Sequence, residues 1–159
     1  MARWHNHYLD GHAHFCTASV RDRRPVLAPQ ADMLLYPAWA RVRASLRVRV
    51  LAYVIMPDHF HLVLWSERGL DVRRFLQRTL SLSRRAYPRR GRFWKERPRV
   101  LPVYSEAVLW TKIDYLHANP VRAGLVSSPE DWLHSSYRQL TGHAGEAAFQ
   151  CDTWEGLLR

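Results

Sequence analysis

Two histidines one residue apart, His59 and His61, are the residues of this sequence best suited to chemistry. They lie in a run of β-prone residues, and side chains two positions apart on a strand point to the same face of the sheet. Two imidazoles on one face can hold a single metal ion between them. Solvated histidines on an open sheet are the common alternative, so a metal site here needs support from other residues.

A second pair, Tyr115 and Asn119, lies four positions apart near the end of a predicted helix and therefore shares one helix face. A tyrosine can attack a phosphodiester once its phenol, with a free pKa of about 10, has lost its proton. Each residue also has an ordinary interpretation, because a lone tyrosine on an amphipathic helix usually packs and an asparagine before proline usually ends a helix. Taken with the two histidines, the pair indicates cleavage of a nucleic acid strand by a tyrosine.

The expected metal ligands are His59, His61 and the side-chain oxygen of Asn119. Two neutral imidazoles and one amide oxygen form an incomplete shell, whose open positions would go to phosphate and water. This set favours Mg²⁺ or Mn²⁺, whereas a closed structural Zn²⁺ site would need a fourth protein ligand. A divalent cation would polarise the phosphate and hold the departing 3′ oxygen.

The charge of the chain is strongly positive, with 24 Lys and Arg against 14 Asp and Glu and a formal net charge of +10 in 159 residues. Almost all of the cations are arginines, which bind phosphate through a planar, bidentate group. Nucleic acid is therefore the expected partner. No apolar run approaches the roughly 18 residues of a spanning helix, and the first 14 residues lack the apolar core of a signal peptide.

The two cysteines, Cys16 and Cys151, fit neither a zinc spacing nor a disulfide framework, which favours a reduced, cytoplasmic protein.

Two runs of basic residues are candidates for contact with DNA. One run contains Arg47 and Arg49. The other, from Arg84 to Arg99, is interleaved with Tyr87, Phe93 and Trp94, as in a track where cations follow phosphates and rings stack on bases. A solvated face is the plain alternative. The predicted DNA-binding residues are Arg47, Arg49, Arg84, Arg85, Arg89, Arg90, Arg92, Trp94, Lys95, Lys112 and Arg122.

The apolar pattern predicts the elements that must position these residues. In chain order they are a strand in 12–20, a helix in 31–44 that is interrupted or restarted at Pro37, a strand in 46–55, its hairpin partner in 59–65, a helix in 70–86, an edge strand or irregular arm in 93–103, and a helix in 106–118 that Asn119 and Pro120 end. This order predicts an α+β fold with a ferredoxin-like βαββαβ sheet, followed by an added C-terminal helix that carries Tyr115 and a tail.

The motif His59-Phe60-His61, followed by Tyr115-Leu116-His117-Ala118-Asn119-Pro120-Val121, resembles the HUH single-strand transposases with one catalytic tyrosine. Within them the sequence is most similar to the REP-associated tyrosine transposases. The likeness runs from about Tyr8 to Leu140, so we expect one HUH transposase domain in 1–140 and a C-terminal tail in 141–159. One departure is Arg122-Ala123, where these proteins often have Lys-His.

The resemblance implies a protein that binds single-stranded DNA and DNA hairpins, and that cleaves and rejoins DNA through a 5′-phosphotyrosine with a free 3′ hydroxyl. Tyr115 would be the nucleophile, and His59, His61 and Asn119 would bind Mg²⁺ or Mn²⁺. The expected setting is the bacterial cytoplasm, in association with the nucleoid, as a monomer or homodimer. Two alternatives stay open: a catalytically silent module that binds DNA or RNA hairpins, and a metal-dependent phosphodiesterase that uses water.

Overall fold

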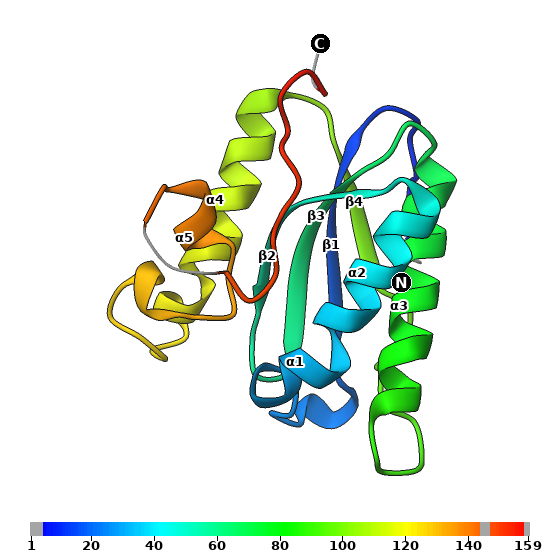
Figure 1. The fold of residues 1–159 in the computed structure, drawn as a ribbon, viewed down its shortest axis with the longest axis vertical. Coiled ribbons are helices and arrows are strands. Elements are labelled where there is room, and N and C mark those ends of the chain that lie inside the picture. Colours follow the sequence, from blue (N-terminus) through cyan, green and yellow to red (C-terminus); the bar gives the residue numbers. More distant parts are fainter. Residues whose placement is uncertain (1–4, 144–146, 158–159) are drawn as a thin grey trace.

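A computed structural model describes residues 5–143 and 147–157 and shows one antiparallel sheet with helices on both faces (Figure 1). The sheet order is β2-β3-β1-β4, which is the ferredoxin-like order and confirms the predicted fold class. The strands are β1 (Ala13–Ser19), β2 (Arg49–Ile55), β3 (His59–Trp65) and β4 (Arg99–Val103). Among the strands of the described residues, β4 pairs with β1 alone and is an edge strand, as its prolines predict.

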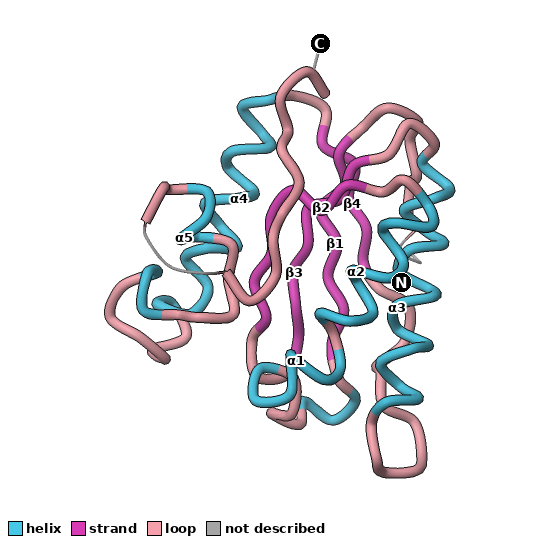
Figure 2. Tube along the Cα trace, viewed as in Figure 1, coloured by secondary structure: helices cyan, strands magenta, loops and turns pink. Residues whose placement is uncertain are grey.

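The helices form two layers (Figure 2). On one face lie α1 (Ala31–Leu34), α2 (Tyr36–Leu46) and α3 (Gly69–Ala86), and on the other lies α4 (Glu106–Arg122). Short helical turns are Arg21–Arg23, Ala28–Gln30, Pro129–Asp131 and α5 (Tyr137–Leu140). Within the described residues, no helix combines the length and the apolarity that crossing a bilayer would need.

Successive side chains along β3 point to opposite faces of the sheet. The core therefore has two parts, a first core on the side of α2 and α3 and a second core on the side of α4. Phe60, Leu62 and Leu64 face α2 and α3 and pack with Trp39 and Phe75. Val63 faces the opposite layer, where it packs with the α4 residues Leu109, Ile113 and Leu116. His59 and His61 lie an even number of positions before Val63 in the same strand, so their imidazoles point to the same face as Val63, towards α4.

The predicted strand in 46–55 begins too early. Leu46 ends α2, and Arg47 follows it with a left-handed backbone (φ 51°, ψ 36°), so the strand starts at Arg49. The predicted alternation also fails at one point, because a β-bulge between Val50 and Ala52 shifts the register against β3. As a result Val50 and Tyr53 lie in the first core, while Leu51 and Ala52 both lie in the second.

The helix predicted to end before Asn119 instead continues through Pro120 to Arg122. Proline has no N–H to donate in a helix interior, which is why a stop was expected. Here Pro120 is buried, and the side chain of Asn119 donates from Nδ2 to the carbonyl of Tyr115 (2.9 Å). Packing of the last turn therefore overrides the local preference.

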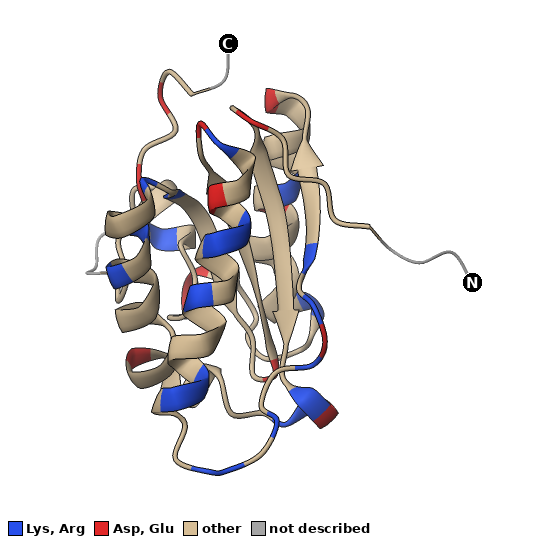
Figure 3. Ribbon diagram, turned by 90° about the vertical axis from the view of Figure 1, so that its right-hand side faces the viewer, with Lys and Arg blue, Asp and Glu red and all other residues tan. Residues whose placement is uncertain are grey.

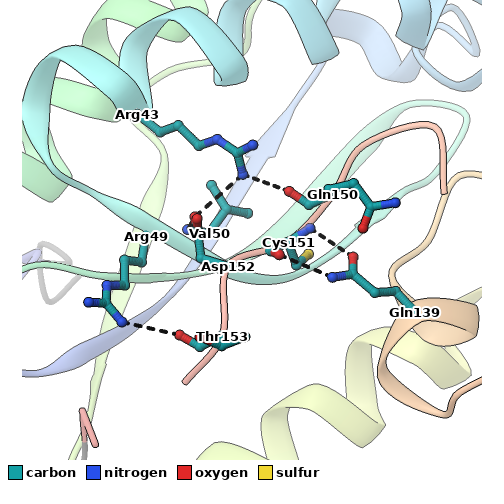
Figure 4. A network of polar contacts seen from close by, with 8 residues as sticks. All are labelled: Arg43, Arg49, Val50, Gln139, Gln150, Cys151, Asp152 and Thr153. Atoms are coloured by element: carbon teal, nitrogen blue, oxygen red, sulfur yellow. Dashed lines mark hydrogen bonds and ion pairs between the residues drawn. The ribbon is translucent and has the colours of Figure 1, made fainter. Parts of the chain in front are cut away.

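Part of the segment predicted as a tail is packed into the domain (Figure 4). The N–H of Asp152 donates to the carbonyl of Val50 (2.8 Å), and its carboxylate accepts from the N–H of Val50 (2.9 Å). Cys151 and the side chain of Gln139 exchange two hydrogen bonds, and Phe149 and Cys151 are buried in the first core. This segment thus covers the free edge of β2. Residues 144–146 and 158–159 of the predicted tail lie outside the described residues.

Candidate active site

The two histidines lie together at the start of β3. The ring centroids of His59 and His61 are 5.0 Å apart, and His61 is buried. His61 stacks on Phe15 of β1 at 5.2 Å, which holds the plane of its ring. The structure therefore places both imidazoles on one face of the sheet, as the spacing predicted.

An oxygen atom lies within hydrogen-bond distance of the Nδ1 atom of each ring. The carboxylate of Asp58 accepts from Nδ1 of His59 (2.7 Å), and its second oxygen forms an ion pair with Arg23 (2.6 Å). Nδ1 of His61 lies 2.8 Å from Oγ1 of Thr17, since β1 and β3 pair in a register that sets Thr17 opposite His61. The Asp58 carboxylate only accepts, so it selects the His59 tautomer whose Nε2 lone pair is free for a metal ion, and the Thr17 hydroxyl orients the His61 ring.

These two partner residues were missed by the sequence interpretation. Asp58 was not among the predicted site residues, although its place directly before His59 was a usable signal. Thr17 carried no such signal, because its contact with His61 depends on strand register across 44 residues of sequence.

The buried environment keeps His61 neutral. Burial, with smaller effects from His59 and the Lys112 ammonium, lowers the pKa of His61 to about 3. A neutral imidazole is the form that binds a metal ion. Across the described part of the chain, Nε2 of neither histidine has a hydrogen-bond partner, so the donor set fits a divalent cation.

A closed metal site is not built from this chain alone. The described residues contain no cluster of three or more His, Cys, Asp and Glu side chains. A third protein ligand would have to be an amide such as Asn119, whose Oδ1 is left free when Nδ2 donates to Tyr115. With two imidazoles and one amide oxygen from the protein, a bound ion would be completed by substrate and water, and this metal site stays a prediction.

Tyr115 lies on α4 beside the imidazoles of its own chain. Its ring centroid is 5.8 Å from that of His61 and 6.0 Å from that of Phe15, and 41% of the residue is exposed. The guanidinium carbon of Arg122 lies 5.3 Å from the ring centroid, two helical turns along the same face. Two other tyrosines have different neighbours: Tyr104 packs against His12, and Tyr137 against His117 and His143.

A buried hydrogen-bond cluster, His117–Ser136–Tyr53, fixes α4 to the sheet. Nε2 of His117 is 2.8 Å from Oγ of Ser136, and that hydroxyl lies 3.0 Å from the backbone N and 3.2 Å from the backbone O of Tyr53. Burial lowers the pKa of His117 to about 4. His117 is two residues from Tyr115, so this cluster sets the position of the tyrosine relative to β2.

The predicted DNA-binding residues are spread over several parts of the surface (Figure 3). Arg84 and Arg85 lie in the last turn of α3, and Arg89, Arg90, Arg92 and Lys95 are exposed in the segment that follows it. Arg92 borders a hollow of about 380 Å³ together with Arg21, Asp22 and Arg24. The ammonium of Lys112 lies 5.2 Å from the ring of Phe15, and Arg122 lies over Tyr115. Arg47 and Arg49 lie at the far end of the sheet, beside a second groove.

The aromatic residues in the basic run mostly serve the core. Tyr87 and Phe93 are buried against each other at 4.5 Å, so the expectation that these two rings stack on bases is wrong. Trp94 is half-buried, and its indole N–H donates to the carbonyl of Leu80 (3.0 Å). A stacking role for Trp94 stays a prediction that its packing does not favour.

Comparison with known proteins gives two related findings. No family model matches the chain. The sequence is 26% identical over 148 residues to the REP-associated tyrosine transposase of Escherichia coli (strain K12), a match that covers 87% of this chain and 84% of that protein. The chain is thus similar to a REP-associated tyrosine transposase over most of the length of both proteins.

A solved structure of a REP-associated tyrosine transposase bound to a REP hairpin has the same fold, with a TM-score of 0.80 at 22% identity. The match covers 100% of this chain and 98% of that one. The resemblance inferred from the two motifs is confirmed, and so is the fold class. The roles of individual residues rest on the geometry described above.

Proposed function

We propose that this protein is a transposase-type endonuclease that binds single-stranded or hairpin DNA, and that cleaves and rejoins it through Tyr115. The single observation that carries the proposal is the exposed Tyr115 ring, edge-on to His61 at 5.8 Å, beside two imidazoles with free Nε2 atoms. The relationship to a tyrosine transposase, and the REP hairpin bound to a structure of the same fold, support DNA as the substrate.

In the proposed reaction, Oη of Tyr115 attacks the phosphorus of a phosphodiester, and the bond from phosphorus to the 3′ oxygen breaks. The phenol proton leaves to solvent, and the departing oxygen takes a proton from water, which yields a free 3′ hydroxyl and a 5′-phosphotyrosine. Attack of a 3′ hydroxyl on that phosphotyrosine reverses the step and rejoins a strand. A step of this kind exchanges one phosphate ester for another, so it requires no external energy source.

The surrounding residues have separate tasks. Arg122, over the Tyr115 ring, and Lys112, over Phe15, supply positive charge close to the attacked phosphate. His59, His61 and Asn119 would hold Mg²⁺ or Mn²⁺, which supplies Lewis-acid polarisation of a phosphate oxygen. Asp58 holds His59 in the tautomer with a free Nε2 lone pair, and Thr17 orients the ring of His61. Because the rings of Tyr115 and His61 lie 5.8 Å apart within one chain, the proposal takes the nucleophile and the imidazoles from the same copy.

The experiment is incubation of the protein with end-labelled hairpin DNA that carries single-stranded flanks, in Mn²⁺, in Mg²⁺ or in EDTA. We expect cleaved DNA and a protein–DNA species that survives denaturing electrophoresis, both with metal only. Cleavage without that species would identify the phosphodiesterase that uses water. Tight binding with no cleavage under any metal would identify a hairpin-binding module, and either result would overturn the proposal.

A further inference from the structure

A groove of about 530 Å³ lies at the end of the sheet away from the candidate active site. It is bordered by the junction of α2 and β2, by the end of β3 and by one side of α3. His59 begins β3 and Trp65 ends it, so the groove and the imidazoles are about 20 Å apart at ~3.3 Å per strand residue. The groove is therefore separate from the site built around Tyr115.

Positive charge dominates the groove. Five arginines line it against two carboxylates, and they come from two directions: Arg47 and Arg49 from the α2–β2 junction, and Arg68, Arg74 and Arg78 from the start and exposed face of α3. Arg74 and Arg78 were not among the residues predicted to bind DNA. Only folding brings the two sets together across the groove.

One buried carboxylate holds two of these arginines in place. Asp71 accepts from Nε and Nη2 of Arg68 (3.0 and 3.2 Å) and from Nη1 of Arg74 (2.9 Å). The side chain of Asp71 is only 10% exposed, whereas those of Arg68 and Arg74 are 67% and 48% exposed. The carboxylate thus orients two guanidinium groups and leaves most of their donors free.

The remaining arginines are positioned without a neutralising partner. Arg49 lies 5.7 Å from the centroid of the Trp65 ring and donates to the carbonyl of Thr153 (Figure 4). Arg47 and Arg78 form no ion pair with any residue that the structure describes. Arg78 lies one helical turn from Arg74, and like charges four residues apart destabilise a helix. A bound anion would remove that repulsion.

The backbone at Arg47 has a left-handed conformation, which allows the charge of this side chain to be removed without loss of stability. Arg47 ends α2 in the left-handed conformation (φ 51°), a position where glycine is the least strained residue and asparagine the next. An arginine there carries backbone strain for no benefit to helix capping.

We propose that this arginine-lined groove binds the phosphodiester backbone of DNA about 20 Å from the bond that Tyr115 cleaves. The inference rests on the proposed DNA-processing function and adds a second contact to it. A concave track with guanidinium groups on both walls fits a rod-like polyanion, because each guanidinium can bind phosphate bidentately. The groove would hold the hairpin stem or a flanking strand while the cleaved segment lies at β3.

The test is fluorescence anisotropy with labelled DNA in EDTA, where cleavage does not interfere. Arg47→Gly removes one cation while placing the residue that its backbone prefers, so its melting temperature should be equal to or above that of the parent. Arg78→Ala removes a cation that has no internal partner. The matched control is Arg41→Ala, which removes one exposed charge from α2 outside the groove.

We expect the double variant Arg47→Gly/Arg78→Ala to bind a hairpin about tenfold more weakly. The slope of log K against log salt should become shallower by roughly 0.7–0.9 per lost contact, while Arg41→Ala changes neither quantity by as much. If affinity falls for the hairpin alone, the groove binds the hairpin stem. If affinity falls equally for an unstructured single strand of the same length, the groove binds a flanking strand. Both results support the groove.

The opposite result is a double variant that matches Arg41→Ala in affinity and salt slope. That result would overturn the proposal that the groove binds DNA, even if Tyr115 cleaves DNA. Failure of the parent protein to bind any DNA would overturn both proposals. If Arg47→Gly melts at a lower temperature than the parent, the comparison is made with Arg78→Ala alone.

Discussion

At the scale of single residues, the chemistry depends on how the two imidazoles are held. His59 and His61 each have Nδ1 occupied by an oxygen, from Asp58 and Thr17, and Nε2 free. Orientation of this kind raises the basicity of a ligand and fixes its direction before an ion arrives. The residues next to the histidines should therefore affect metal affinity although they do not touch the ion.

Thr17→Val tests this idea, because valine keeps the shape of threonine and loses Oγ1. We expect the Mn²⁺ concentration for half-maximal cleavage to rise by 10–100-fold, as is typical when such a partner is lost, with activity restored at high Mn²⁺. Thr111→Val is the matched control, since Thr111 is exposed on α4 and its hydroxyl donates only within the helix. Equal metal requirements for the two variants would show that Thr17 does not tune the site.

At the scale of elements, the contact between α4 and β2 decides where Tyr115 lies. The cluster His117–Ser136–Tyr53 joins the helix, the C-terminal segment and the sheet through one hydroxyl. All three residues are buried, so their polar atoms have no access to water when the hydroxyl is removed.

Ser136→Ala should therefore lower stability by about 1–3 kcal/mol, because two buried groups lose their partner. It should also reduce cleavage more than DNA binding, since it loosens the helix that carries the nucleophile and leaves the arginines unchanged. Thermal unfolding, cleavage rate and DNA affinity would be measured on the same preparations, with Ser81→Ala on the exposed side of α3 as control. A variant that loses affinity and rate in equal proportion would contradict a positioning role for the cluster.

Much of this arrangement could be predicted from the sequence, because it is local. The alternation in β3 predicted that His59 and His61 share a face, and helical spacing predicted that Tyr115 and Asn119 do. The order of the predicted helices and strands was enough to predict the ferredoxin-like sheet. Burial of Pro120 goes with a helix α4 that continues to Arg122, and a bulge moved Leu51 to the other core, neither of which has a local signal. The partners Thr17 and Ser136 depend on strand register and on a C-terminal segment, so they required the structure.

At the scale of the whole molecule, buried neutral histidines tie stability to pH. Burial lowers the pKa of His14, which is fully buried in β1, from an ordinary 6.5 to about 4. The unfolded chain then binds more protons than the folded chain between these two values, so stability is complete above pH 6.5 and falls as the pH drops towards 4. His61 and His117 act in the same direction.

His14→Gln removes the titrating group and should flatten this dependence. At about 1.36 kcal/mol per pKa unit, His14 contributes on the order of 3 kcal/mol to the loss between pH 6.5 and 4. Denaturant unfolding in EDTA across that range measures it, and His7→Gln, at an exposed position, is the control. If His14 were protonated in the folded protein, the free energy of unfolding would depend on pH in the same way in both variants, and that result would contradict the prediction.

The layers of the molecule separate its two proposed tasks. The candidate active site is on the α4 side at the start of β3, and the arginine groove is at the opposite end of that strand. The C-terminal segment packs along β2 between them and contributes Thr153 to the contact with Arg49 (Figure 4). A rigid sheet can therefore hold the DNA backbone and the cleaved bond at a fixed separation.

The most direct measurement of the central claim, that Tyr115 is the nucleophile, is mass spectrometry of the protein–DNA adduct formed with hairpin DNA and Mn²⁺. After nuclease and protease digestion, we predict a nucleotide linked through its 5′ phosphate to the peptide that contains Tyr115. We predict no adduct in Tyr115→Phe, which should still fold and bind the hairpin. An adduct mapped to Tyr104 or Tyr137, or one that persists in Tyr115→Phe, would contradict the claim.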